Sequence, residues 1–415
     1  MTDATEQRPG SANAVAAGSA AHTDAAFSGA AVPSRAAAPP GAPDLAASRS
    51  GGVYRSGAAA PDTLPSVMRQ ALFHAPGDVQ IVQVPVPTPG PGELLVRVEV
   101  ALVCGTDVKT YRRGHPVLLA EAPAPFGHEY CGVVAAVGAG AEEFVVGDRV
   151  SSANSAPCGH CFFCRREQLS LCENIQPLLN GAYADYLLVP ARIVEVNMFR
   201  VPHGMEPERA ALLEPLACVL KGLEVGDVGP GTTVGVVGLG PIGLMMTYAA
   251  ARRGARVIAV VRNDGKLAAA RAVGAAEVVD LRTAGGDAAA VVRALTEQGK
   301  GVDVAVEAVG RPEVWDFAVA MVRRGGVVNF FGGCEQGSVA NIDTYRLHYE
   351  ELCLTAAFHH TPRHVRMAAE VLARVDFPHR TLVTHRYTLD ELTSALRAAG
   401  RETEVKGFIK AAVIP

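Results

Sequence analysis

The stretch Val234-Gly-Val-Val-Gly-Leu-Gly-Pro-Ile-Gly243 decides how the second half of this chain is interpreted. An apolar strand is followed by three closely spaced glycines, namely Gly238, Gly240 and Gly243. Glycines with this spacing permit a tight turn, close backbone approach to a pyrophosphate and close packing of a helix on a sheet. We therefore predict a dinucleotide-binding loop that includes Pro241 and Ile242. A helical stretch is expected to follow at 244–253, with the phosphates at its N-terminus.

Around this loop, from about residue 216 to 355, apolar strands alternate with alanine-rich helical stretches. The strands are expected at 234–237, 257–261, 302–306 and 327–331. This alternation predicts a parallel sheet built from βαβ units. Upstream, from 68 to 215, short strands separated by turn residues predict a β-rich, barrel-like domain.

The two ends of the chain differ from these central regions. Residues 1–67 consist mainly of Ala, Gly, Pro and Ser, so we predict disorder there. The first strand-like sequence begins at Met68, which suggests that Met68 is the natural start, a hypothesis that intact mass would test. The last segment, 356–415, contains one clear helical pattern, at 362–375, followed by short mixed elements.

Composition excludes several classes of function. The chain has 415 residues, 49% hydrophobic and 19% charged, and a net charge of −4 without a basic stripe, so a nucleic-acid partner is not expected. No apolar run reaches the roughly 18–20 residues of a membrane-spanning helix, so no membrane partner is expected either. A secretion signal is not recognisable at the N-terminus, and we expect a cytoplasmic protein.

The end of the second expected strand bears on the choice of cofactor. An acidic residue there would bind the adenosine ribose of NAD, but this chain has Val261 followed by Arg262. An arginine at this position, with no acidic residue at the strand end, favours binding of a 2'-phosphate. The sequence therefore modestly favours NADP over NAD. The alternative is that Asp264, slightly displaced, still reaches the ribose.

Four cysteines lie within one short segment: Cys158, Cys161, Cys164 and Cys172. The spacing C-x2-C-x2-C-x7-C can place four thiolates tetrahedrally around one ion. Four thiolates leave no open position, so we predict a structural site, with zinc as the metal and an iron–sulfur cluster as the alternative.

Three further motifs are ordinary individually: Cys104-Gly-Thr-Asp107, Gly127-His-Glu129 and Glu214-Pro-Leu216. In combination with the cysteine segment and the glycine loop, they make the chain from about 69 to 415 resemble the zinc-containing medium-chain dehydrogenase/reductases. Within that family the resemblance is to the sorbitol and threonine dehydrogenase-like enzymes. It implies a GroES-like barrel domain and a Rossmann domain, with residues 356–415 returning to the barrel domain.

The resemblance also implies a catalytic zinc site. Cys104 and His128 would be ligands, with Glu129 beside them as a ligand or exchangeable ligand, and Glu214 takes the position that selects the polyol-type branch. Three protein ligands would leave an open position at which zinc acts as a Lewis acid on an alcohol. Cys218 has the wrong offset for a ligand, and we interpret it as a core cysteine.

The same resemblance gives Thr106 the position of a proton-relay hydroxyl. Lys109 stands where the family often has a histidine as the outer base, so it either accepts the proton or contacts cofactor phosphate or a charged substrate. For the pair His359-His360, substrate contact and a surface turn both remain open. We interpret Arg323-Arg324 as a solvated helix end before a Gly325-Gly326 turn.

The leading prediction is a zinc-dependent oxidoreductase that transfers hydride between NAD(P) and a secondary alcohol or ketone of a polyol, sugar or cyclitol. Such a chain would hold one catalytic and one structural zinc. The alternatives are a zinc-free quinone or enone reductase of the same superfamily and a non-catalytic zinc- and nucleotide-binding protein. By resemblance, a homo-oligomer, dimer or tetramer, is expected.

Overall fold

A computed structural model describes residues 64–114, 121–175, 178–262 and 264–415 of the chain, and these described residues all belong to one compact unit. The predicted disorder of 1–67 therefore falls almost entirely outside the described residues. Its end is corrected by one residue, because the first strand begins at Val67, which pairs with Pro85.

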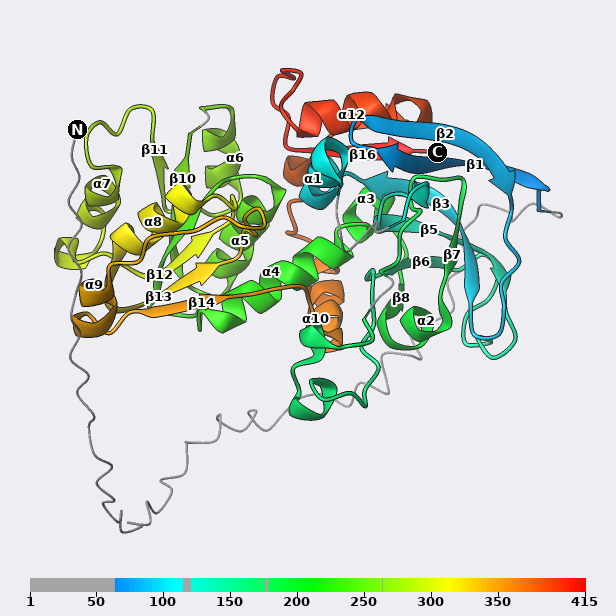
Figure 1. The fold of residues 1–415 in the computed structure, drawn as a ribbon, viewed down its shortest axis with the longest axis horizontal. Helices are drawn as coiled ribbons and strands as arrows, with labels where there is room; N and C mark the ends of the chain where they lie inside the picture. The colour runs from blue at the N-terminus through cyan, green and yellow to red at the C-terminus, as the bar shows by residue number, and fades with distance from the viewer. Residues whose placement is uncertain (1–63, 115–120, 176–177, 263) are drawn as a thin grey trace, which may run out of the picture. The chain divides into compact units, whose positions relative to one another are not determined.

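The glycine loop belongs to a six-stranded parallel sheet in the order β11-β10-β9-β12-β13-β14 (Figure 1). Its strands are β9 (Thr233–Val237), β10 (Arg256–Val261), β11 (Glu277–Asp280), β12 (Val302–Glu307), β13 (Val322–Phe330) and β14 (Cys353–Ala356). The order reverses beside β9, the first strand, as in doubly wound dinucleotide-binding sheets. The predicted Rossmann arrangement is confirmed.

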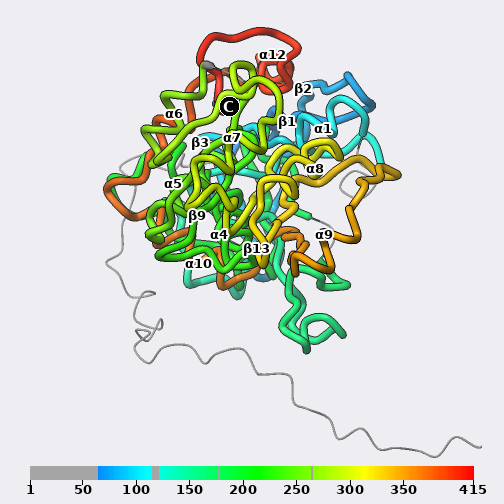
Figure 2. Tube along the Cα trace, turned by 90° about the vertical axis from the view of Figure 1, so that its left-hand side faces the viewer, coloured from blue at the N-terminus to red at the C-terminus, as the bar shows by residue number. Residues whose placement is uncertain are grey.

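Helices cover both faces of this sheet. They are α4 (Leu213–Val225), α5 (Pro241–Arg252), α6 (Leu267–Ala272), α7 (Ala288–Ala294), α8 (Pro312–Met321) and α9 (Thr344–Tyr349). Figure 2 shows α5 and α6 on one side of the strands and α8 on the other. Because strands covered on both faces bury every side chain, Val234, Val236, Ala305 and Val306 are all fully buried.

A second, largely antiparallel sheet contains strands from both ends of the described chain, in the order β15-β16-β3-β5-β6-β8, with β7 also paired to β3. The strands are β3 (Leu94–Leu102), β5 (Glu129–Val137), β6 (Arg149–Ser152), β7 (Tyr186–Val189), β8 (Met198–Arg200), β15 (Val383–Thr388) and β16 (Lys410–Ile414). A smaller sheet joins β1 (Val67–Ala75), β2 (Asp78–Pro85) and β4 (Ala124–Pro125). This β-rich half matches the expected barrel-like domain.

The helices of this half and of the C-terminal segment are α1 (Gly105–Arg113), α2 (Ala191–Asn197), α3 (Pro207–Ala210), α10 (Pro362–Leu372), α11 (His379–Leu382) and α12 (Leu392–Ala399). The helix expected at 362–375 ends three residues early, at Leu372, and α12 was not foreseen. The expected boundary at 215/216 falls inside α4, which is continuous and packs against both α5 and α10. No helix among the described residues has the length and apolar character needed to span a bilayer.

The expected strand 327–331 corresponds to the later part of a longer strand, β13. Arg323 and Arg324 lie within this strand, after α8 has ended at Met321. The interpretation of the arginine pair as a helix end is therefore wrong. The pair belongs instead to an irregularity in the pairing of β12 with β13.

Candidate functional site

The four clustered cysteines converge in a lobe that contains two short 3-10 turns, Cys164–Arg166 and Leu169–Leu171. All four Sγ atoms lie within 4.8 Å of one another. The Cys158–Cys164 and Cys161–Cys172 Sγ pairs are 4.0 and 3.9 Å apart. Tetrahedral zinc with Zn–S bonds of about 2.3 Å needs sulfur atoms about 3.8 Å apart, whereas a disulfide needs about 2.05 Å. The lobe therefore has the spacing of a closed four-thiolate metal site.

Hydrogen-bond donors surround these sulfur atoms. The backbone N–H groups of Cys158 and Asn174 both donate to Cys172 Sγ, each at 3.3 Å. The Asn174 side-chain amide donates to Cys158 Sγ at 3.4 Å, and this bond lowers the pKa of the Cys158 thiol. Donors of this kind favour thiolates, the form in which cysteine binds a metal.

A second group of potential ligands joins the start of α1 to the start of β5. Cys104 is the N-cap of α1, and its Sγ accepts a hydrogen bond from the Thr106 N–H at 3.4 Å. His128 immediately precedes β5, and Glu129 is its first residue. One ligand atom from each of Cys104, His128 and Glu129 lies within 4.8 Å of the others. Sulfur, imidazole and carboxylate form a donor set that suits zinc.

Asp107 fixes the orientation of the histidine in this group. Its Oδ1 is 3.2 Å from His128 Nδ1, and its Oδ2 accepts hydrogen bonds from the Cys104 N–H and the Tyr183 hydroxyl. Burial opposes a charge on His128, but the neighbouring Asp107 carboxylate and the Cys104 sulfur raise the pKa of the imidazole. A carboxylate on one ring nitrogen orients the other nitrogen toward a metal.

Glu129 has a cationic partner from the last strand. Lys410 Nζ lies 2.6 Å from Glu129 Oε2, with side-chain exposures of 3% and 0%, and it also donates to the Val103 carbonyl. Burial acts against the charged ammonium, yet the Glu129 carboxylate holds the pKa of Lys410 above its usual value. No hydrogen-bond partner for Glu129 Oε1 is found among the described residues.

Glu214 lies on the first turn of α4, in a neighbouring group with Cys218 and His359. Cys218 Sγ donates to Glu214 Oε1 at 3.4 Å, so this cysteine contacts the site rather than only the core. His128, Glu129 and Lys410 all act electrostatically on Glu214, which places the two groups side by side. Burial is the largest of these influences and raises the pKa of Glu214.

The two histidines after β14 enclose the same region. His359 adopts a left-handed backbone conformation, φ 61°, and its Nε2 is 2.5 Å from Ser155 Oγ. His360 is buried, with Nε2 3.2 Å from Asn154 Oδ1 and 3.9 Å from Glu214 Oε1. The histidine pair therefore lies beside the candidate metal ligands and not in a separate surface turn.

The glycine loop has the geometry that its spacing predicts. Gly238 has φ +93°, and a Cβ on Gly243 would lie 1.8 Å from the Gly238 carbonyl oxygen. A Cβ on Gly240, the N-cap of α5, would meet nothing within 4 Å. The first and third glycines are thus required by the protein itself, whereas Gly240 faces open space at a helix N-terminus, where a phosphate would bind.

The remaining residues singled out from the sequence lie on two elements. Arg262 follows β10 and is exposed, next to residue 263 and the Asp264 side chain, which are outside the described residues. Thr106 and Lys109 lie on α1, where the Lys109 ammonium donates to the Gly333 carbonyl at 3.0 Å. Lys109 therefore links α1 to the segment that follows β13.

Sequence reasoning missed Asp107, Tyr183 and Lys410, which support the candidate ligands, and also Asn154 and Ser155 beside the two histidines. Asp107 was within a quoted motif, and a carboxylate three residues after a candidate cysteine ligand could have been assigned an orienting role. Lys410 opens the apolar strand Lys-Ala-Ala-Val-Ile, and a lysine at such a buried position is a signal for a buried ion pair.

Comparison with known proteins identifies the family. Residues 90–198 match the family model described as alcohol dehydrogenase GroES-like domain, and residues 241–374 match that described as zinc-binding dehydrogenase. The chain is 31% identical to sorbitol dehydrogenase of Bacillus subtilis over 346 residues, 81% of this chain and 95% of that enzyme. It is 34% identical to L-threonine 3-dehydrogenase of Deinococcus radiodurans over 276 residues, 64% of this chain and 76% of that enzyme.

Solved structures agree with these relatives. A zinc-binding dehydrogenase from Sinorhizobium meliloti, bound to NADP, superposes with a TM-score of 0.77 at 30% identity, covering 85% of this chain and 100% of that one. The resemblance, fold class and enzyme class predicted from the sequence are confirmed. The chain therefore belongs to the zinc-type medium-chain alcohol dehydrogenases, in the branch that includes sorbitol and threonine dehydrogenases.

Proposed function

We propose that this enzyme interconverts a secondary alcohol and its ketone, using zinc and NAD(P), with Cys104, His128 and Glu214 as the ligands of the catalytic metal. The observation that carries the proposal is the convergence of Cys104, His128 and Glu129, with Glu214 in the adjoining group. The four-cysteine lobe would hold a second, structural zinc. Its Sγ spacing supports this role.

The charges around the two glutamates favour Glu214 over Glu129 as the third ligand. Glu129 is already neutralised by the Lys410 ammonium at 2.6 Å. Among the described residues, the group within ion-pair distance of the Glu214 carboxylate is the His360 imidazole at 3.9 Å. Burial lowers the pKa of His360 well below its usual value, so that imidazole is neutral. A buried carboxylate facing a neutral imidazole and a thiol has the greater need of a cation. Glu129 would then serve as the exchangeable ligand.

When bound, zinc supplies a Lewis acid for the alcohol oxygen, and the nicotinamide accepts the hydride. Oxidation of one alcohol releases one ketone, one reduced cofactor and one proton, and the protein must conduct that proton away. We assign the first hydroxyl of that route to Thr106. The Lys109 ammonium donates to the Gly333 carbonyl, a contact that supports a role in positioning α1 against the dinucleotide-binding half. Such a positioning role does not require proton transfer. An unchanged pH–rate profile in Lys109→Ala would exclude a proton-transfer role.

For the cofactor, we assign Gly238, Gly240, Pro241, Ile242 and Gly243 to the pyrophosphate and Arg262 to the adenosine side. The exposed Arg262 at the carboxyl end of β10 is available to a 2'-phosphate, which favours NADP. Comparing kcat/KM with NADP and NAD in the wild type and in Arg262→Ala tests this assignment. A wild type that strongly prefers NAD would contradict it.

A polyol-type substrate fits the polar side chains next to Glu214. Asn154 and Ser155 are both buried and hydrogen-bonded to His360 and His359, and His360 Nδ1 has no partner among the described residues. Buried polar groups of this kind can bind the additional hydroxyl groups of a polyol, whereas a simple alcohol has only the one hydroxyl that reacts. We therefore expect sugars, polyols or cyclitols to be better substrates than ethanol.

We also propose a homo-oligomer, as a dimer or tetramer. Strand β14 is an edge of the parallel sheet, and the adjacent segment exposes Val339, Tyr345 and Tyr349 at 78%, 69% and 66%. An unpaired edge next to exposed apolar side chains is a common site of self-association. Light scattering after gel filtration would give the mass, and a monomer at micromolar concentration would contradict the proposal.

The domain division is likewise a proposal: a catalytic domain from 68 to 215, a dinucleotide domain from 216 to 355 and a C-terminal segment, 356–415, that rejoins the first. The pairing of β16 with β3 supports the return of the last segment. The continuity of α4 means that the first boundary is a shared helix rather than a flexible linker.

The most informative test is a substrate screen that follows NAD(P)H absorbance with and without a chelator, combined with zinc analysis. Two zinc ions per chain and chelator-sensitive oxidation of polyols are expected. No zinc would favour the zinc-free quinone or enone reductase, and one zinc without activity would favour a non-catalytic binding protein.

A further inference from the structure

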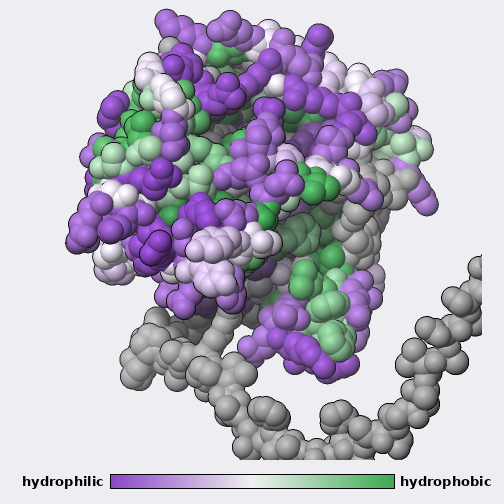
Figure 3. Space-filling view, turned by 60° about the vertical axis from the view of Figure 1, so that its left-hand side comes forward, coloured by the Kyte–Doolittle hydropathy of each residue, from purple (hydrophilic) through white to green (hydrophobic). Residues whose placement is uncertain are grey.

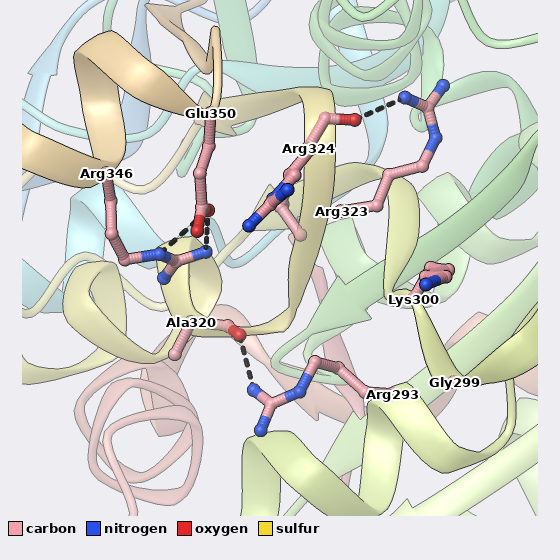
Figure 4. Close-up of a pocket in the computed structure, with 9 residues that line it drawn as sticks. Arg293, Gly299, Lys300, Ala320, Arg323, Arg324, Arg346 and Glu350 are labelled. Carbon is pink, nitrogen blue, oxygen red and sulfur yellow. Dashed lines mark hydrogen bonds and ion pairs between the residues drawn. The ribbon is translucent and has the colours of Figure 1, made fainter.

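A basic hollow lies away from the glycine loop. It encloses about 640 Å³, and its lining contains five cationic side chains and one acidic one (Figure 4): Arg293, Lys300, Arg323, Arg324, Arg346 and Glu350. Arg293 lies on α7 and Lys300 in the segment before β12. Arg323 and Arg324 lie on β13, Arg346 lies on α9, and Glu350 directly follows α9. The volume is within the range of small-molecule sites, about 300–1,000 Å³. The chain as a whole has a net charge of −4, so this cluster of positive charge is a feature of the hollow and not of the whole surface.

An irregularity of the sheet presents two of these arginines. Val302 of β12 pairs with Val322 of β13, but Val304 pairs with Val327, so β13 advances from 322 to 327 while β12 advances only from 302 to 304. The extra residues of β13 include Arg323 and Arg324. Bulges bend a strand and redirect its side chains, and they occur often beside functional sites. Here the bulge turns two cations toward the hollow.

The opposite wall is held close to this bulge by a glycine. Gly301 has φ +117°, and a Cβ there would lie 2.7 Å from the Arg323 backbone nitrogen and the Met321 carbonyl oxygen. Its N–H donates to Thr296 Oγ1 at 2.9 Å in the buried interior. This contact positions Lys300, the preceding residue, at the rim of the hollow.

The cations of the hollow are only partly neutralised. Arg323 pairs with Asp303 at 2.6 Å, Arg346 with Glu350 at 2.8 Å, and Arg293 with Asp287 at 3.1 Å. Over the part of the chain that the structure describes, no acidic partner lies within ion-pair distance of the exposed side chains of Lys300 and Arg324. Three of the five cationic side chains thus have an acidic partner, and of these partners Glu350 is the one that lines the hollow.

The hollow is separate from the proposed cofactor site. Lys300 precedes β12 and the bulge is at the start of β13, so the hollow lies at the amino ends of these strands. The glycine loop follows the carboxyl end of β9, which runs parallel to β12. One strand length, about 15–20 Å, separates the two edges of a sheet of this kind. Figure 3, which brings this half of the molecule forward, shows polar side chains surrounding scattered apolar patches.

We propose that this hollow is a second ligand site, which binds a compact polyanion carrying clustered phosphate or carboxylate groups. Lys300 and Arg324 supply the unpaired charges, and the paired guanidinium groups supply a fixed array of N–H donors. Guanidinium groups bind both phosphate and carboxylate through paired hydrogen bonds. The expected ligands are therefore defined by their density of negative charge and not by one type of anionic group.

Isothermal titration calorimetry of the zinc-loaded enzyme, saturated with NADP to fill the dinucleotide site, tests the proposal. Tripolyphosphate and citrate are the two probes, and they distinguish a phosphate ligand from a carboxylate one. Binding of either probe is expected, with an affinity at least about ten-fold lower in the double variant Lys300→Glu/Arg324→Glu. The matched control, Arg366→Glu/Lys406→Glu, reverses two exposed cations outside the hollow and should bind like the wild type.

Absence of binding to the wild type by both probes, or an equal loss in the two double variants, would overturn the proposal. If Lys300→Glu/Arg324→Glu does not unfold cooperatively, the single variants Lys300→Ala and Arg324→Ala replace it. Each should weaken binding by about three-fold or more, and unchanged affinity in both would also refute the site. Because this experiment measures binding and not alcohol oxidation, its failure leaves the proposed enzymatic function unaffected.

Discussion

The four-cysteine lobe and the Cys104–His128–Glu214 region are both candidate zinc sites, but they are built differently. The lobe takes all its sulfur atoms from residues 158–172, and exposed backbone and amide groups support them. The other region draws on α1, β5, α4 and β16, and a buried carboxylate and a buried ammonium support it. A closed site of local residues suits a structural metal, whereas an open site at the meeting of several elements suits catalysis.

The largest expected difference between the two sites is in activity. Cys104→Ala removes a proposed ligand of the catalytic metal and should lower kcat/KM by at least about 10⁴-fold, roughly 5 kcal/mol. Cys161→Ala should lower the zinc content by one ion and the thermal midpoint, while the remaining folded enzyme keeps activity within about ten-fold. Zinc analysis and kinetics on the same preparations would check both. Equal losses of activity in the two variants would remove the functional distinction.

The buried ion pair of the catalytic region gives the next largest effect. Lys410→Met leaves the Glu129 carboxylate buried without its cation and should cost about 3–5 kcal/mol in the free energy of unfolding. The double variant Lys410→Met/Glu129→Gln should recover most of that loss, because neither charge is then unpaired. Urea denaturation measures both. A double variant as unstable as the single one would show that packing, not charge, makes Lys410 important.

The orienting carboxylate should matter less than the ligands. Asp107→Asn keeps the shape of the side chain but removes the charge next to His128 Nδ1, and it should weaken zinc binding at this site by about 10–100-fold. Competition with a chromogenic chelator measures the affinity of each site separately. The lobe should retain its zinc unchanged, and loss of both ions together would contradict independent sites.

The smallest effect on zinc affinity is expected for Asn174, which supports a cysteine of the lobe as Asp107 supports His128. Asn174→Ala removes one side-chain donor to Cys158 Sγ, but the Asn174 backbone N–H still donates to Cys172 Sγ. The exposed position allows water to replace the amide, so zinc affinity of the lobe should fall by less than about ten-fold. A larger loss than in Asp107→Asn would reverse the comparison, since the exposed support would then matter more than the buried one.

Local sequence predicted the lobe and the glycine loop, because their ligands and contacts are only a few residues apart in the chain. The proposed catalytic group was predicted only through a family resemblance, since each of its motifs is ordinary when taken alone. Arg323 and Arg324 were misinterpreted because pairing between two strands, and not the local sequence, makes the bulge at the start of β13. Cys218 was set aside on its offset alone, although one helical turn brings it beside Glu214.

The sequence by itself determined the alternation of strands and helices, the cysteine spacing and the glycine turn, because hydrophobic periodicity and short-range geometry act over a few residues. Only the tertiary structure decided that Lys410 neutralises Glu129, that Glu214 lies beside Cys218 and His359, and that five cations surround one hollow. Those contacts join residues far apart in the chain. Burial makes the charges among them consequential, since a buried charge needs a partner that no local pattern specifies.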